Sequence, residues 1–169
     1  GEALMFARRY DEAAVVLERT LAREESFFPA RFTLALVRES QGDPARAVAE
    51  YLSALRRAGA DAATESALRT AYESRGFTGF WQERLAQLIA GSSAGYQSKY
   101  ELATVAARVG RATDALDWLE SAYAERAPEM IRLAVDPQLD PLRSEPRFVD
   151  LLRRLRLPPA LVRGASSRR

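Results

Sequence analysis

A fixed spacing of 34 residues between glycines is the feature that most constrains this chain. Gly42, Gly76 and Gly110 stand 34 residues apart without an insertion. On the same period, mostly apolar residues align in five columns. The columns are Leu34, Leu68, Leu102; Ala13, Ala47, Trp81, Ala115; Leu17, Tyr51, Leu85, Leu119; Thr20, Ala54, Leu88, Ala122; and Leu21, Leu55, Ile89, Tyr123. A period of this length is typical of a solenoid, whose units are too small to bury their own apolar faces and therefore pack on their neighbours.

The content of one period resembles the tetratricopeptide repeat (TPR). The clearest unit reads Arg31-Phe32-Thr33-Leu34-Ala35, Gly42-Asp43-Pro44, Ala47, Tyr51 and Ala54, and a second reads Tyr100-Glu101-Leu102-Ala103, Gly110, Ala115, Leu119, Ala122 and Pro128. Between them Trp81 stands where the family has alanine, so we expect that helix pair to pack less closely. The resemblance covers residues 1–129 and implies an all-α, right-handed TPR-like solenoid of antiparallel helix pairs.

Local signals predict where the helices begin and end. Apolar residues at three- and four-residue spacing, such as Ala13, Val16, Leu17 and Leu21, indicate amphipathic helices. The predicted helices are 1–7, 10–24, 29–41, 44–57, 62–75, 77–90, 98–110 and 111–126. Asp43, Asp61 and Ser98 are the expected N-caps, and the three periodic glycines are the expected helix ends.

Beyond residue 127 the period is lost. Pro128, Pro137, Pro141 and Pro146 interrupt the backbone too often for another repeat. We therefore expect a C-terminal capping segment over 130–157, with a short turn or helix near 130–134 and a final helix over 145–156. This ending resembles those of bacterial TPR arrays, which often follow a winged-helix DNA-binding, serine/threonine kinase or cyclase domain. Residues 158–169 read as a disordered basic tail.

Composition excludes several kinds of catalytic chemistry. The chain has no cysteine and no histidine, so thiol catalysis, disulfides, imidazole acid–base catalysis and Cys/His metal sites are ruled out. Asp136 and Asp140 lack further carboxylates at the spacing of a calcium or magnesium loop, and turn-forming and capping roles explain both. Ser92, Ser93 and Lys99 form a weak candidate for nucleophilic catalysis. We predict no enzymatic activity, no cofactor and no metal.

Two further expectations concern the parent protein. On the 34-residue period, Gly1 falls in the middle of a first helix, which predicts a truncated first repeat and a longer parent polypeptide. No transmembrane stretch or signal peptide is recognisable. Cysteine absence is compatible with a reducing cytoplasm, and an arginine- and alanine-rich composition favours a bacterial origin. We expect a cytoplasmic C-terminal regulatory part of a bacterial signalling or transcription protein, of undetermined oligomeric state.

The concave groove that the resemblance implies is the expected functional site. Peptide contacts in this family come from first-helix positions, which here are Phe32, Leu36, Glu39, Ser66, Thr70, Glu73, Tyr100, Thr104 and Arg108. These residues differ from the lysine, asparagine and arginine clamp of chaperone-binding members. We therefore expect protein–protein interaction with an extended or helical partner that carries an apolar anchor, contacted most specifically by Tyr100 and Arg108.

A competing function arises from charge. The whole chain carries a net charge of +2, yet residues 143–169 contain eight arginines and two acidic residues, which leaves the remainder at −4. A basic end of this kind attracts phosphates, so accessory contact with nucleic acid or an anionic membrane surface is the alternative. The tail lacks aromatic residues for base stacking, which weighs against nucleic acid.

Overall fold

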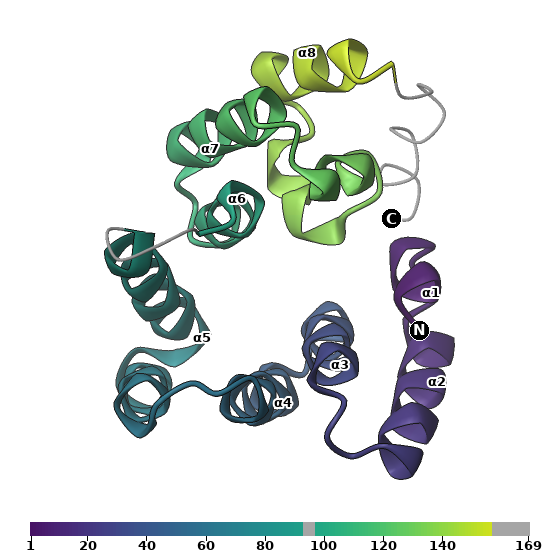
Figure 1. Ribbon diagram of the computed structural model, residues 1–169, viewed down its shortest axis with the longest axis vertical. Coiled ribbons are helices and arrows are strands. Elements are labelled where there is room, and N and C mark those ends of the chain that lie inside the picture. Colours follow the sequence, from purple (N-terminus) through teal and green to yellow (C-terminus); the bar gives the residue numbers. More distant parts are fainter. Residues whose placement is uncertain (93–96, 157–169) are drawn as a thin grey trace. The chain divides into compact units, whose positions relative to one another are not determined.

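The computed structural model describes residues 1–92 and 97–156, and within these ranges helices are the regular elements and no strand occurs (Figure 1). The all-α prediction is therefore confirmed. The elements are α1 (Glu2–Phe6), α2 (Tyr10–Arg23), α3 (Phe28–Ser40), α4 (Pro44–Arg57), α5 (Ala62–Ser92), α6 (Lys99–Arg108), α7 (Ala112–Ala124), the 3-10 turns η1 (Pro128–Arg132) and η2 (Pro137–Leu142), and α8 (Pro146–Arg154). The expected disordered tail lies outside the described residues.

The three periodic glycines end helices as the sequence predicts. Gly42 and Gly110 both have φ of +77°, and a Cβ at either position would meet no atom within 4 Å. Backbone conformation rather than space therefore favours glycine here. Gly76 interrupts α5 with φ 66° and ψ −161°, which separates the residues before it from those after it as two helices.

The predicted helix caps are present. Asp43 Oδ1 accepts a hydrogen bond from the Arg46 amide at 3.0 Å, and Asp61 Oδ1 accepts one from the Thr64 amide at 2.7 Å. Ser98 Oγ accepts from the Glu101 amide at 3.3 Å. Each cap satisfies a backbone donor that the first helical turn leaves without a partner.

Contacts divide the chain into two compact units, Gly1–Phe80 (unit 1) and Trp81–Arg169 (unit 2). The division falls beside Trp81, the residue that interrupts the alanine column. In unit 1, α3 packs against both α2 and α4, and α1 packs against α2 and α3. Small residues of the alanine column are buried in this unit, since Ala13 is 0% and Ala47 3% exposed.

In unit 2, α6 packs against α7, η2 packs against α6, and α8 packs against α7. The turn η2 was not predicted. It begins at Pro137, and Asp136 caps it by accepting from the Gln138 amide at 2.9 Å. Its buried Leu139 belongs to a set of fully covered side chains from the C-terminal segment, which also includes Leu133, Leu142, Phe148 and Leu151. The segment therefore contributes buried apolar side chains and packs on both α6 and α7.

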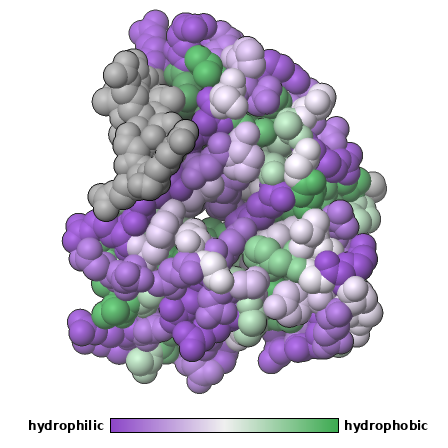
Figure 2. Space-filling model, turned by 180° about the vertical axis from the view of Figure 1, so that it is seen from behind, coloured by the Kyte–Doolittle hydropathy of each residue, from purple (hydrophilic) through white to green (hydrophobic). Residues whose placement is uncertain are grey.

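Two apolar residues that the sequence assigned to buried faces are partly exposed. Val16 is 39% and Ile89 38% exposed. In α2, Ala13, Ala14, Leu17 and Leu21 supply the buried face, which leaves Val16 at its edge. The face shown in Figure 2 is mainly hydrophilic, with hydrophobic residues in small separate groups. No helix in the described ranges has both the length and the apolarity needed to cross a membrane.

Candidate partner-binding surface

A row of aromatic rings runs through unit 1 and contains the predicted groove residue Phe32. The Phe32 ring, which is half-buried, lies edge-on to Phe28 with centroids 6.2 Å apart and to Tyr51 with centroids 5.1 Å apart. Tyr51 in turn lies edge-on to Phe80 at 5.5 Å, and Phe80 stacks with Phe77 at 6.4 Å. Edge-to-face packing of this kind stabilises aromatic pairs beyond their buried area, so the row joins α3, α4 and α5 firmly.

The row reaches solvent at the start of α3. Phe28 is 39% exposed, and its neighbour Phe27, the residue before the helix, is 43% exposed. These two residues are not among the contact positions predicted from the sequence. Two consecutive phenylalanines in a turn before Pro29 were the available signal, because turns are ordinarily polar.

Ion pairs hold the turn that carries these phenylalanines. Arg31 contacts Glu50 of α4 at 3.0 Å and Glu25 of the turn at 3.7 Å, while Arg57 of α4 also pairs with Glu25. Arg31 is only 15% exposed, so its contacts are less screened than those of a typical surface pair. The turn is thus joined to both α3 and α4.

The other predicted residues of unit 1 fall into two groups. Leu36 is half-buried and packs against the core formed by α1, α2 and α3, so much of its side chain serves the fold. Glu39 is half-buried, whereas Ser66, Thr70 and Glu73 of α5 are exposed. The three α5 residues recur at four- and three-residue spacing and therefore share one helix face.

The prediction for Tyr100 and Thr104 is wrong, because neither is accessible. Tyr100 is 4% and Thr104 3% exposed. The Tyr100 hydroxyl donates to Asp136 Oδ2 at 2.9 Å, and Thr104 donates to the Glu101 carbonyl at 2.9 Å. The C-terminal segment covers this face of α6, since η2 packs directly on it. Burial raises the pKa of Tyr100 far above its ordinary value, and the neighbouring Asp136 carboxylate raises it further.

Arg108 has an intramolecular contact that the sequence did not predict. Its guanidinium carbon lies 4.2 Å from the centre of the Trp81 ring, which is a cation–π geometry. Trp81 is buried at 4% exposure, and Arg84 of α5 pairs with Glu101 of α6 at 2.8 Å. These contacts join α5 to α6 at the position where tryptophan replaces the small residue of the repeat.

The basic end of the described chain is largely paired with acidic residues. Arg147 contacts Asp117 at 2.7 Å and Glu120 at 2.9 Å, which links α8 to α7. Arg143 contacts Asp140 at 2.6 Å, and Arg153 contacts Asp150 at 3.1 Å. No group of three potential metal-ligating side chains is present among the residues that the structure describes.

Comparisons with known proteins identify no relative. No protein-family model matches the chain, and no curated protein or solved structure matches it either. The resemblance to the TPR family therefore stays a prediction based on the 34-residue period.

Proposed function

We propose that this chain is a TPR-like protein-interaction module without catalytic activity, which binds a peptide or helix of a partner protein through unit 1. The observation that carries the proposal is the exposed pair Phe27 and Phe28 at the end of the aromatic row. Binding hot spots are enriched in large side chains held by well-packed surroundings. Phe28 has this support from Phe32, and Phe27 is joined to it in a turn held by ion pairs.

The proposed contact surface differs from the one predicted from sequence. Tyr100 and Thr104 are excluded by burial, and Arg108 packs on Trp81. Phe28 and Phe32 lie one helical turn apart on α3 and make a continuous apolar contact. A partner that fits this surface presents an apolar or aromatic side chain, as the sequence analysis proposed for its anchor.

In its biological setting, the proposed role is that of a scaffold or regulatory part of a larger cytoplasmic bacterial signalling or transcription protein. This part of the proposal is supported by the resemblance of the repeats and of the C-terminal ending to bacterial arrays. The alternative contact with nucleic acid or an anionic surface has less support, because Arg143, Arg147 and Arg153 already contact carboxylates.

Peptide selection tests the proposal directly. A displayed library of random peptides is selected on the purified chain, and the affinity of recovered peptides is measured by calorimetry. We expect Phe27→Ser/Phe28→Ser to weaken binding by at least tenfold, which corresponds to about 1.4 kcal/mol. The matched control is Val15→Ser/Val16→Ser, which changes two exposed apolar residues of α2 in the same unit.

Circular dichroism and thermal unfolding establish that each variant remains folded. Equal affinity of the phenylalanine variant and the wild-type chain would contradict the proposed surface. If the selection recovers no peptide and the chain instead binds DNA in a separate assay, with an affinity that falls as salt is added, the alternative function would be favoured.

A further inference from the structure

The outward face of α2 combines exposed valines with exposed arginines. Val15 is 46% and Val16 39% exposed, and Arg19 and Arg23 are exposed as well. Arg19 follows Val15 by four residues and Val16 by three, and Arg23 follows Arg19 by four, so the four side chains share one side of the helix. We call these four residues the α2 stripe. The stripe lies opposite the helix face that is buried against α1 and α3.

The positive charge of the α2 stripe is not paired within the described chain. Arg19 and Arg23 contact no carboxylate in the described ranges. The carboxylates of α2 contact other residues instead: Glu12 contacts Arg9 at 2.7 Å, Asp11 contacts Gln41 at 2.7 Å, and Glu18 pairs with Arg38. Two like charges four residues apart repel each other on a helix, so carboxylates supplied from outside would stabilise the stripe.

The 34-residue period does not require these residues. One, two and three periods after Val15 the sequence has Ala49, Glu83 and Asp117, and after Arg19 it has Ser53, Gln87 and Ser121. The corresponding helix positions therefore accept alanine, serine and carboxylates elsewhere in the chain. Valine also forms helices less readily than alanine, because its β-branch restricts χ1. Exposed valines beside unpaired arginines are thus explained neither by helix propensity nor by packing within unit 1.

We propose that the α2 stripe is a second interaction surface, which binds an acidic amphipathic helix of a partner protein. A helix that lies along α2 presents its side chains at the same spacing, so carboxylates four residues apart reach Arg19 and Arg23 while an apolar residue between them covers the valines. The stripe spans about 12 Å, which corresponds to about two turns of a helix. Arginine suits this role, because its planar guanidinium binds a carboxylate through two hydrogen bonds.

The composition of the α2 stripe favours a protein helix over a membrane surface. Helices that lie in the membrane interface bury bulky leucine, phenylalanine or tryptophan side chains, whereas the exposed apolar residues here are two valines. The proposal does not depend on the function proposed for Phe27 and Phe28, which lie beyond the end of α2. Different probes therefore test the two surfaces.

Selection from a displayed library of helical peptides, randomised on one face, tests the proposal on the whole chain. We expect enrichment of peptides that carry aspartate or glutamate at two positions four residues apart, with an apolar residue between them. The affinity of a recovered acidic peptide is measured by fluorescence anisotropy. Arg19→Gln/Arg23→Gln and Val15→Ser/Val16→Ser should each weaken its binding by about tenfold. Added salt should weaken it as well, because the contact surface is exposed.

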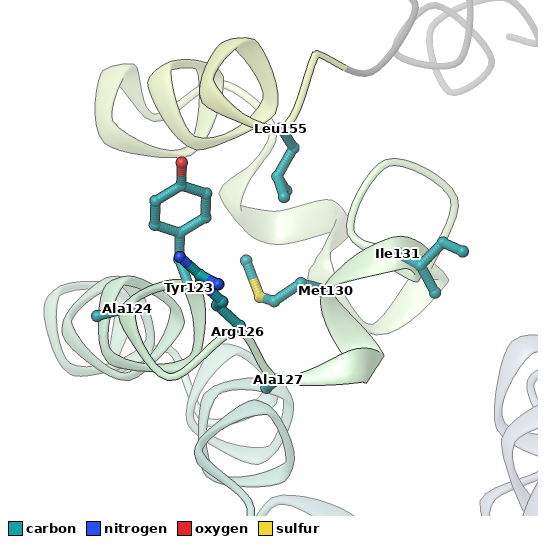
Figure 3. A pocket seen from close by; sticks show the side chains of 7 residues that line it. All are labelled: Tyr123, Ala124, Arg126, Ala127, Met130, Ile131 and Leu155. Atoms are coloured by element: carbon teal, nitrogen blue, oxygen red, sulfur yellow. The ribbon is translucent and has the colours of Figure 1, made fainter.

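Three control variants should keep the affinity for the acidic peptide. Arg46→Gln/Arg69→Gln removes the charge of two other exposed arginines of unit 1. Ile131→Ser removes an exposed apolar side chain of unit 2, since Ile131 is 78% exposed and borders a cavity of about 560 Å³ (Figure 3). Phe27→Ser/Phe28→Ser removes the surface proposed above, and a loss of affinity in this variant would assign the acidic peptide to the phenylalanines and overturn its assignment to the α2 stripe.

A charge swap separates recognition from a structural role. An Arg19→Glu/Arg23→Glu chain should lose the acidic peptide and should bind the same peptide with lysine in place of its acidic residues. Both arginines are exposed, so the substitutions spare the fold, which circular dichroism checks. Failure of the lysine peptide to bind, or a selection without acidic pairs, would refute the proposal. Binding of the chain to vesicles that contain phosphatidylserine, without any acidic peptide being recovered, would also refute it and indicate an anionic lipid surface instead.

Discussion

Removing one hydroxyl group, by Tyr100→Phe, tests how the C-terminal segment is held on α6. The hydroxyl donates to Asp136 at 2.9 Å, and both side chains are at least 96% buried. A hydrogen bond to a charged group contributes about 1.5–3 kcal/mol to stability, and the buried carboxylate left behind loses one of its donors. We therefore expect Tyr100→Phe to lower the free energy of unfolding by about 1.5–3 kcal/mol.

The assay is urea unfolding followed by tryptophan fluorescence. Both tryptophans, Trp81 and Trp118, lie in unit 2, so the signal reports the unit that contains the hydrogen bond. Tyr123→Phe, which removes the hydroxyl of a half-buried tyrosine in the same unit, is the control and is expected to cost less than about 0.5 kcal/mol. In an Asp136→Ala background the Tyr100 substitution loses most of its effect, because the acceptor is absent.

The same bond predicts a dependence on alkaline pH. The pKa of Tyr100 is raised in the folded chain above its unfolded value of 10.0, so the folded state retains a proton that the unfolded state releases. The contribution of Tyr100 to the free energy of unfolding is therefore fully present below pH 10. Above pH 10 it falls by about 1.4 kcal/mol for each further pH unit. The free-energy difference between wild-type and Tyr100→Phe chains should shrink accordingly. Equal stability of the two chains at pH 7, or a difference that stays constant between pH 9 and 11, would refute this reasoning.

Three further predictions concern the helices themselves. Gly76→Ala should lower the free energy of unfolding by about 1–3 kcal/mol, because φ 66° with ψ −161° is a backbone conformation that few residues other than glycine adopt. A lower thermal midpoint, measured by circular dichroism, checks this. Ala115→Leu should cost about 1–3 kcal/mol by overpacking a position with no exposure, and an unchanged urea midpoint would mean that the α6–α7 contact tolerates a larger side chain. Glu65→Gln should cost up to about 1 kcal/mol at pH 7, because hydrogen bonding from Arg56 lowers the pKa of Glu65 from 4.5 to about 2. The stabilisation by the Glu65 carboxylate is present above pH 4.5 and disappears as pH falls toward 2. Urea unfolding of the wild-type and Glu65→Gln chains should therefore show a smaller difference in unfolding free energy at pH 3 than at pH 7.

The helices and their ends followed from the sequence because their signals are local. Gly42 and Gly110 tolerate positive φ, and Asp43 and Ser98 place an acceptor next to backbone donors only three residues away. Such signals act within a turn of helix and do not depend on what packs from elsewhere. Other helix ends lack a glycine: Arg126 and Arg156 lie at the predicted ends of their helices and adopt the left-handed conformation in which glycine is usual.

The accessibility of the candidate site was decided by tertiary structure. The resemblance to the repeat family placed Tyr100 and Thr104 on the open face of α6. In the structure η2 packs on α6, and Asp136, which accepts the Tyr100 hydrogen bond, lies 36 residues further along the chain. That segment has no repeat and several prolines, so its path could not be read from periodicity. Conversely, Phe27 and Phe28 became a candidate surface only once the ring contacts of Phe32 and Tyr51 were known. Local patterns therefore determined which residues form helices, whereas long-range packing determined which of their side chains a partner can reach, because burial depends on neighbours that are distant in the sequence.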